Sequence, residues 1–395
     1  MQGNYNDVVI LSTNESLGYS DKVYAHLAGR VKEVSGTVDE PKHIAVRVFP
    51  DKEKRPRVRE NIRGKQAYYI HNCVGDNGEY HPDIGLMKAG ITGYAIRNSR
   101  VSRLVYVIPY VPYQRQDRMD SPRVPITAKF ALHLLNIPPS DIPVSLITFD
   151  MHTKQAVGFV DYTIENLPTE RLFADYFERV GLGNFVVVGI TRSGDSDSGL
   201  ATERSVRDFN ETHTARESLK YMTVVSPDTG GATRARSFAK RFEAPIAIID
   251  KRREGPGRNE VMHIVGREYV KGRVALIVDD IIDTAGTMIK SAKALYRAKA
   301  LGVIGAAPHG LFSTPQGLEP TEERIRRAKL KIVTANTIVR KPEYLTNNSD
   351  WLVARLETEP LAGEIIYRMH GGLSVSELFD GNRGNQDDDD LPVIY

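Results

Sequence analysis

Short apolar runs rich in β-branched residues recur along this chain, and they constrain its fold more than any other feature. Runs of this length are typical of strands buried on both faces of a parallel sheet. Between them, apolar residues recur every three or four positions, as they do on one face of a helix. Strands that alternate with helices predict a mostly parallel α/β sheet. The predicted strands are 68–70, 103–109, 144–149, 221–225, 246–249, 274–278 and 331–334, and the predicted helices cover 83–98, 125–136 and 284–300.

The chain is too long for one such sheet, because it has 395 residues and a domain averages about 150. We therefore expect two α/β domains, with a boundary near residues 160–170. Residues 186–220 are polar and rich in serine and threonine, which predicts a surface excursion. The acidic end, 381–395, is expected to be a disordered tail.

Composition excludes several classes of protein. The 53 Lys and Arg residues nearly balance 50 Asp and Glu residues, which argues against a dedicated nucleic-acid binder. The single cysteine, Cys73, excludes an intramolecular disulfide or a cysteine-based zinc cluster and is expected to be a buried apolar side chain. No segment reaches the roughly 18 apolar residues of a membrane span, and the start does not resemble a secretory signal. These features predict a cytoplasmic protein that does not span a membrane.

Five of the predicted strands end in segments dense in polar residues. Ligands of open α/β sheets bind at the carboxyl ends of the strands. We therefore expect binding and chemistry at these five positions. They are YVPYQRQDR after strand 103–109, DMH after 144–149, SPDTGG after 221–225, DKRR after 246–249 and DDIIDTAGT after 274–278.

The segment VALIVDDIIDTAGT is the most informative of the five. Its small residues let backbone N–H groups approach a phosphate, and a following helix N-terminus favours an anion. The two leading carboxylates suit the paired hydroxyls of a ribose, or a magnesium ion. A helix start that is merely capped needs neither the doubled aspartate nor the TAGT run. The candidate binding residues are Asp279, Asp280, Asp283, Thr284, Ala285, Gly286 and Thr287.

Two common nucleotide-binding motifs are missing from the sequence. No G-x-x-x-x-G-K-[ST] occurs, so any nucleotide must be held without a Walker A loop. No G-x-G-x-x-G follows a strand, which argues against a dinucleotide oxidoreductase.

The segment DDIIDTAGT resembles the phosphoribosyl-diphosphate (PRPP) motif of type I phosphoribosyltransferases. Further blocks, in order and spacing, resemble one branch, the ribose-phosphate diphosphokinases or PRPP synthetases. These blocks are ENIRGK, YVPYQRQDRMDSPRVPITAK, TFDMHTKQAVGF, VVSPDTGGATRARSFAK, IIDKRR, VMHIVG and GGLSVSELF.

The resemblance covers most of the chain and implies two phosphoribosyltransferase-type I-like domains. Residues 1–165 would form the ATP side, joined by about 363–380, and residues 166–362 would hold the ribose 5-phosphate site. The implied reaction moves the β,γ-diphosphoryl group of ATP to the 1-hydroxyl of ribose 5-phosphate. Its products are PRPP, for nucleotide biosynthesis, and AMP.

The resemblance places ribose 5-phosphate on the DDIIDTAGT residues and Mg²⁺ near His152 and Asp228. A hard cation prefers oxygen ligands, so we expect His152 to act partly through a coordinated water. A hydrogen-bonded core histidine is the alternative, but the neighbouring Asp150 and Lys154 favour a functional role.

ATP is implied to contact the RQDR block and a hairpin that would hold adenine. An aromatic face there would stack on the base, and two carboxylates would accept hydrogen bonds from its amine. The family usually has a Ser-Asp-Gly-Glu run where this chain has Pro50 and Lys52, so the base preference stays open, with a charged surface turn as the alternative. The candidate ATP-binding residues are Phe49, Asp51, Glu53, Arg115 and Gln116.

Lys251 and Arg253 begin a segment with glycine and proline that continues to Arg258. Such a composition suits a mobile loop with hinges. Its cations would offset the charge that develops on the transferring group, whereas a solvated basic turn is the alternative. Lys251 and Arg253 are therefore the candidate catalytic residues.

The family often forms a hexameric ring with a regulatory phosphate or ADP site between subunits. This resemblance implies a homo-oligomer, and it leaves open whether regulation is retained. The matching positions are Arg63, Ser374, Ser376 and Phe379.

Two alternatives accompany the synthetase hypothesis. A phosphoribosyltransferase that consumes PRPP would explain DDIIDTAGT, but not the RQDR, DMH and DKRR segments. A non-catalytic regulatory subunit of a synthetase would have lost or remodelled the cationic loop, whereas Lys251 and Arg253 are present here.

Overall fold

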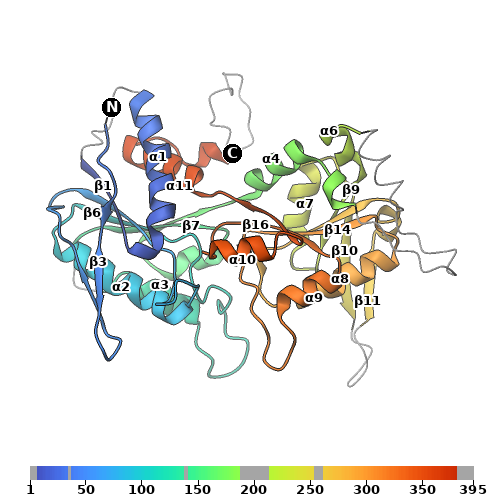
Figure 1. Ribbon diagram of the computed structural model, residues 1–395, viewed down its shortest axis with the longest axis horizontal. Coiled ribbons are helices and arrows are strands. Elements are labelled where there is room, and N and C mark those ends of the chain that lie inside the picture. Colours follow the sequence, from blue (N-terminus) through green and yellow to red (C-terminus); the bar gives the residue numbers. More distant parts are fainter. Residues whose placement is uncertain (1–6, 34–36, 138–140, 187–212, 253–260, 380–395) are drawn as a thin grey trace. The chain divides into compact units, whose positions relative to one another are not determined.

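The computed structural model describes residues 7–33, 37–137, 141–186, 213–252 and 261–379 (Figure 1). The chain divides into two compact units. The first comprises Met1–Pro168, Thr337–Lys341 and Glu357–Tyr395, and the second comprises Thr169–Asn336 and Pro342–Leu356. Residues 166–168, 337–341 and 357–362 thus belong to the first unit, whereas the sequence analysis assigned them to the second domain.

The first unit is built on a six-stranded sheet in which all neighbouring strands are parallel. Its spatial order is β2-β1-β5-β6-β7-β8. The strands are β1 (Val8–Ser12), β2 (Lys42–His43), β5 (Gln66–Ile70), β6 (Arg103–Val107), β7 (Val144–Phe149) and β8 (Thr163–Leu167). The helices are α1 (Leu17–Glu33), α2 (Pro82–Asn98), α3 (Thr127–Leu134) and α11 (Glu359–Gly371), with 3-10 turns η2 (Asn14–Ser16), η3 (Lys154–Phe159) and η7 (Ser376–Leu378).

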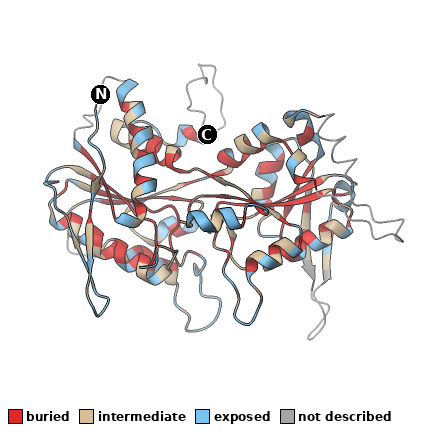
Figure 2. Cartoon of the chain, viewed as in Figure 1, coloured by how far each residue is buried: buried red, intermediate tan, exposed pale blue. Residues whose placement is uncertain are grey.

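Helices pack on both faces of this sheet, and its strands are mostly coloured as buried in Figure 2. Along β1, Val8 and Ile10 pack in one apolar cluster with α1 and α11, while Val9 and Leu11 pack in another with α2 and α3. Successive strand side chains point to opposite faces. A continuous apolar run is therefore needed to fill both layers, which is why these strands lack hydrophobic alternation.

An antiparallel hairpin, β3 (Ala45–Val48) and β4 (Lys54–Arg57), forms a separate two-stranded sheet in the first unit. Its turn is closed by two backbone hydrogen bonds. The N–H of Phe49 donates to the carbonyl of Glu53 at 2.8 Å, and the N–H of Lys52 donates to the carbonyl of Phe49 at 2.9 Å.

The second unit has a seven-stranded sheet in the order β11-β10-β9-β12-β14-β16-β17, in which the edge pair β10 and β11 is antiparallel. The remaining pairs are parallel. The strands are β9 (Met222–Ser226), β10 (Ile246–Arg252), β11 (Val261–Val265), β12 (Val274–Val278), β14 (Gly302–Ala307), β16 (Lys331–Ala335) and β17 (Leu352–Leu356), and a short parallel pair joins β13 (Ile281–Ile282) to β15 (His309–Gly310).

The helices of the second unit include the two that begin at the polar strand exits, α7 and α8. They are α4 (Glu170–Val180), α6 (Ala215–Ser218), α7 (Ala232–Arg241), α8 (Gly286–Arg297), α9 (Thr321–Arg327) and α10 (Pro342–Asn347), with 3-10 turns η4 (Gly183–Phe185), η5 (Leu219–Tyr221) and η6 (Arg267–Tyr269). No helix within the described ranges is long and apolar enough to cross a bilayer.

One predicted strand exit is wrong. β10 continues through Arg252, so Lys251 lies in a strand and does not begin a loop. The physical reason is the antiparallel partner: Asp250 pairs with His263 and Lys251 with Met262. These pairs satisfy the backbone of polar residues that the sequence placed beyond the sheet. Arg253 lies outside the described residues.

Residues 213–220 of the predicted excursion 186–220 are ordered into α6 and η5. Thr214 and Glu217 form a reciprocal capping box at the start of α6. Ser218 is buried and accepts a 2.8 Å hydrogen bond from the N–H of Leu182, so the end of the segment belongs to the packed unit. Residues 187–212 and the predicted tail 381–395 lie outside the described residues.

Candidate active site

Two adjacent carboxylates follow β12 and are fixed by backbone hydrogen bonds. The N–H of Asp279 donates to the carbonyl of Ala306 at 3.0 Å, which extends the pairing with β14 by one residue. The N–H of Asp280 donates to Oδ1 of Asp279 at 3.0 Å, and the carbonyl of Asp280 accepts from the N–H of His309 at 3.2 Å. Both residues are thus held at the carboxyl edge of the sheet, and the carboxylate of Asp279 accepts one of these hydrogen bonds.

Burial disfavours the charge on the first of these carboxylates. Together with the hydrogen bond and negative charge of Asp280, burial raises the pKa of Asp279 to about 7. Arg234 on α7 opposes this effect, because its Nη1 lies 3.7 Å from Asp279 Oδ1 and 3.4 Å from Asp280 Oδ1. A ligand that donates hydrogen bonds or brings positive charge would favour the ionised pair.

The loop 283–287 turns directly into α8. Ala285 takes a left-handed backbone conformation with φ of 53°, and its carbonyl accepts from the N–H of Ile289 at 2.8 Å as the helix begins. The N-cap residue of α8 is Ala285, whose side chain makes no capping hydrogen bond. The N–H groups and the dipole of a helix N-terminus favour an anion there.

The loop after β9 fixes one more predicted residue near this edge. The Oγ of Ser226 donates to the carbonyl of Asp228 at 2.6 Å, and the N–H of Gly231 donates to Asp228 Oδ1 at 2.9 Å. The other carboxylate oxygen makes no hydrogen bond within the described part of the chain. Because β9 and β12 are parallel neighbours, their exits meet at the same sheet edge.

The exits of β6 and β7 are joined in the first unit. Buried Gln114 accepts, through Oε1, a 2.9 Å hydrogen bond from the backbone N–H of His152. The side chains of Arg115, Gln116 and His152 are exposed. Three predicted residues therefore share the carboxyl edge of the first sheet. Sequence reasoning missed Gln114, although it stands beside Arg115 in the RQDR block.

The predicted adenine hairpin contains a cationic cluster that the sequence analysis did not identify. The guanidinium carbons of Arg47 and Arg55 lie 4.9 and 5.5 Å from the centroid of the Phe49 ring. The two arginines are directly opposite each other across β3 and β4. The sequence could have indicated this cluster, because residues placed symmetrically about a hairpin turn lie opposite each other in an antiparallel pair.

The turn residues of the hairpin show how the two departures from the family pattern are accommodated. Lys52 adopts a φ of 73°, in the left-handed region that glycine prefers. Asp51 accepts a 3.1 Å hydrogen bond through Oδ1 from the N–H of Glu53. Pro50, Asp51 and Glu53 are exposed.

Three of the four predicted regulatory positions line one cavity of about 550 Å³ in the first unit. Ser374, Ser376 and Phe379 contribute to its wall together with Arg103 and Glu165. Arg63 is exposed in the loop before β5 and does not line this cavity.

No group of three or more His, Cys, Asp or Glu side chains in the described ranges could hold a metal ion. Asp228 belongs to the second unit and His152 to the first. Magnesium is commonly held through one or two carboxylates and substrate phosphates. The uncommitted oxygen of Asp228 fits that requirement.

Comparisons with known proteins agree with this architecture. Residues 8–137 match the family model of the N-terminal domain of ribose phosphate pyrophosphokinase, and residues 201–347 match that of the phosphoribosyl transferase domain. The crystal structure of phosphoribosylpyrophosphate synthetase from Mycobacterium smegmatis has a TM-score of 0.66 at 24% identity, covering 92% of this chain and 98% of that one. The fold and the strand-exit loop together define a protein with phosphoribosyltransferase-like α/β domains, which confirms the predicted fold class.

Curated relatives narrow this class. Ribose-phosphate pyrophosphokinase 1 of Listeria monocytogenes is 36% identical over 335 residues, covering 84% of this chain and 87% of the relative. Ribose-phosphate pyrophosphokinase of Corynebacterium ammoniagenes is 34% identical over 346 residues, covering 86% and 92%. The chain belongs to the ribose-phosphate pyrophosphokinase family, as the sequence motifs predicted, and it is an enzyme.

Proposed function

We propose that the protein transfers the β,γ-diphosphoryl group of ATP to the 1-hydroxyl of ribose 5-phosphate, giving PRPP and AMP for nucleotide biosynthesis. The single observation that carries this proposal is the pair Asp279 and Asp280 at the sheet edge, followed within a few residues by the N-terminus of α8. A sugar phosphate has hydroxyls that donate to carboxylates and a phosphate that accepts from N–H groups. Membership of the family supports the same reaction.

Ribose 5-phosphate would lie along the edge of β12. Its hydroxyls would donate to Asp279 and Asp280, and its phosphate would accept from the N–H groups of the loop. The loop residues are Asp283, Thr284, Ala285, Gly286 and Thr287, four of which are only partly buried.

ATP would be bound by residues of the first unit. Arg115 and Gln116 are exposed beside the His152 loop, where they could contact the phosphates. The hairpin would supply Phe49 for the adenine ring, with Asp51 and Glu53 as hydrogen-bond acceptors for its amine. The arginines beside Phe49 would have to share the ring with the base or move from it.

In the second unit, Asp228 would hold magnesium together with substrate phosphates, and in the first unit His152 would act toward magnesium partly through a coordinated water. The metal ion would neutralise charge on the diphosphoryl group. The protein contributes alignment of the 1-hydroxyl with the β-phosphorus, since phosphoryl-type transfer depends mainly on positioning and charge. Burial of Asp280 would help to exclude water from the sugar side.

Lys251 and Arg253 would supply the cations that stabilise the transition state. Lys251 follows Asp250 on β10, and β10 is the parallel neighbour of β9, whose exit carries Asp228. This adjacency supports a role for the cationic segment at the same sheet edge as the sugar phosphate site.

Three further features are part of this proposal. The enzyme would be a cytoplasmic homo-oligomer, a hexamer by family resemblance. Its regulatory ligand, phosphate or ADP, would contact Ser374, Ser376 and Phe379 in the first-unit cavity. Arg63 would complete that site only from another subunit.

The decisive experiment incubates the purified protein with ATP, ribose 5-phosphate and Mg²⁺ and separates the nucleotides by chromatography. We expect AMP and PRPP in equal amounts. Formation of ADP would indicate an ordinary kinase, and no product would indicate a regulatory subunit. A PRPP-consuming transferase would react only when PRPP and a base were supplied. Chelation of Mg²⁺ should abolish the product.

A further inference from the structure

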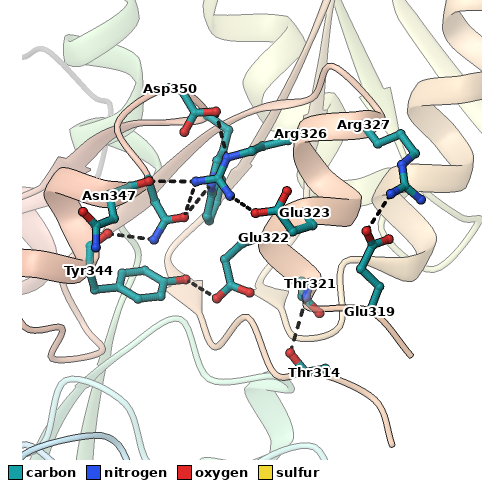
Figure 3. A network of polar contacts seen from close by, with 12 residues as sticks. Thr314, Glu319, Thr321, Glu322, Glu323, Arg326, Arg327, Tyr344, Asn347 and Asp350 are labelled. Atoms are coloured by element: carbon teal, nitrogen blue, oxygen red, sulfur yellow. Dashed lines mark hydrogen bonds and ion pairs between the residues drawn. The ribbon is translucent and has the colours of Figure 1, made fainter. Parts of the chain in front are cut away.

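α9 of the second unit is anchored by a polar network around Arg326 (Figure 3). The Nε of Arg326 donates to the carboxylate of Asp350 at 2.9 Å. Its Nη2 donates to the carbonyl of Asn347 at 2.7 Å and to Oδ1 of Asn348 at 2.8 Å. Arg326 also pairs with Glu323 on the same helix. This arginine is thus committed to joining α9 to the chain after α10.

One more contact joins α9 to α10, because the hydroxyl of Tyr344 on α10 donates to Glu322 at 2.9 Å (Figure 3). Arg327 pairs locally instead: its Nη2 donates at 2.6 Å to Glu319, just before α9. Two of the three arginines of α9 are therefore paired with carboxylates, and Arg326 and Glu322 fix the position of the helix against residues 344–350.

Arg324 is the third arginine of α9, and its contacts differ from those of the other two. Its Nη1 donates to the carbonyl of Thr284 at 3.3 Å. Its Nη2 lies 4.0 Å from the place that a Cβ on Gly286 would occupy. No carboxylate of the described residues lies within ion-pair distance of Arg324. A half-buried guanidinium with unused donors therefore lies beside the loop 283–287.

Binding a phosphate at that loop requires a nearby cation, because the loop itself is negatively charged. The segment DDIIDTAGT holds three aspartates and no Lys or Arg. A phosphate ester adds about −1.5 to −2 at neutral pH, whereas a helix N-terminus offers only about +0.5. Arg234 is engaged with Asp279 and Asp280. Among the described residues, Arg324 is the arginine placed to balance an anion at the start of α8.

We propose that Arg324 binds the 5-phosphate of ribose 5-phosphate together with the loop 283–287. This inference rests on the proposed function, because it takes the loop as the sugar-phosphate site. One N–H of the guanidinium would keep the Thr284 carbonyl, and the others would donate to phosphate oxygens. Charge-assisted hydrogen bonds of this kind are about twice as strong as neutral ones.

The test compares Arg324→Gln and Arg324→Lys with wild type. Glutamine retains an N–H donor for the Thr284 carbonyl but has no charge, whereas lysine retains both. Arg327→Gln, on the same helix, is the matched control for the loss of one charge. For each protein we would measure kcat, the KM values of ribose 5-phosphate and ATP, and the thermal unfolding midpoint. Direct binding of ribose 5-phosphate would be measured by calorimetry.

We expect Arg324→Gln to raise the KM and Kd of ribose 5-phosphate by about ten- to a hundredfold. The KM of ATP and the unfolding midpoint should remain near wild type, and Arg324→Lys should recover most of the affinity. Added salt should weaken sugar-phosphate binding less in Arg324→Gln than in wild type. Arg327→Gln should match wild type in every measurement.

A Kd of ribose 5-phosphate within twofold of wild type in Arg324→Gln would overturn the inference. So would equal losses for both substrates with a lowered unfolding midpoint in both variants, because that pattern indicates a structural role. If wild type bound ribose 5-phosphate but formed no AMP, the proposed function would fail. The inference would still stand in that case if Arg324→Gln weakened the measured binding.

Discussion

The buried side chain of Gln114 accepts a 2.9 Å hydrogen bond from the backbone N–H of His152. The loop after β6 thereby sets the position of the loop after β7. An exposed histidine is held in place by a neighbour that sequence reasoning did not select. We expect the role of His152 to depend on this contact as much as on its own ring.

Replacement of Gln114 by methionine tests this dependence. The variant keeps the length of the side chain but leaves the N–H of His152 without its acceptor, which costs about 1 to 3 kcal/mol of unfolding free energy. We expect kcat to fall about tenfold or more, because a small misplacement of a contact residue impairs alignment. Urea unfolding measures the loss of unfolding free energy, and steady-state kinetics measures the fall in kcat. Gln155→Met, at an exposed position of η3, is the control, and a kcat equal to that of the control would contradict the prediction.

Lys88 on α2 and Glu15 after β1 form a second buried contact, with 2.5 Å between Nζ and Oε1. The Lys88 side chain is 1% exposed and that of Glu15 is 25% exposed. We expect Lys88→Met to lower the unfolding free energy by about 2 to 3 kcal/mol, because it leaves a poorly solvated carboxylate unpaired. Adding Glu15→Gln should restore part of this loss. Denaturant unfolding of the two single variants and the double variant measures the coupling free energy between Lys88 and Glu15. If the double variant's loss of unfolding free energy equals the sum of the two single losses, the predicted coupling is contradicted.

The local hydrophobic pattern of the sequence predicted the limits of some strands correctly. It missed features that depend on residues distant in the sequence. The strands 144–149 and 274–278 end where apolar runs meet aspartate, so their limits follow from burial. The extension of β10 to Arg252 depends on pairing with β11, which no local pattern encodes. Arg324 reaches the Thr284 carbonyl from 40 positions away, through the placement of α9. The sequence predicted the loop, but not the arginine that tertiary packing brings to it.

The candidate catalytic lysine gives a direct test of the diphosphoryl-transfer proposal. We expect Lys251→Ala to lower kcat by about two orders of magnitude or more, the range for loss of an important electrostatic donor. The KM values should change much less. Lys240→Ala, at an exposed position of α7, controls for loss of one positive charge. Steady-state assays of AMP formation measure kcat and KM for both variants. A near-normal kcat for Lys251→Ala would remove that residue from the mechanism.

Asp279 should make the stability of the fold depend on pH. Burial, reinforced by Asp280, raises the pKa of Asp279 to about 7, whereas its ordinary value is 3.8. Between these values the folded state binds more protons than the unfolded state, so this residue's contribution to stability falls as pH rises from about 4 to 7 and then levels off. We expect Asp279→Asn to lose this dependence. Its stability relative to wild type should therefore increase over the same interval in urea unfolding, and a constant difference would contradict the raised pKa.

The same ionisation should control binding of the sugar. A ribose hydroxyl donates best to the ionised carboxylate, so the affinity of wild type for ribose 5-phosphate should rise as pH increases through about 7. The substrate phosphate also titrates, with a second pKa near 6, and Asp279→Asn separates the two effects because it retains only the titration of the phosphate. We expect Asp279→Asn to bind ribose 5-phosphate more weakly than wild type, and its affinity to rise less with pH. Calorimetric titrations between pH 5.5 and 8.5 measure both profiles, and identical profiles would show that Asp279 does not accept from the sugar.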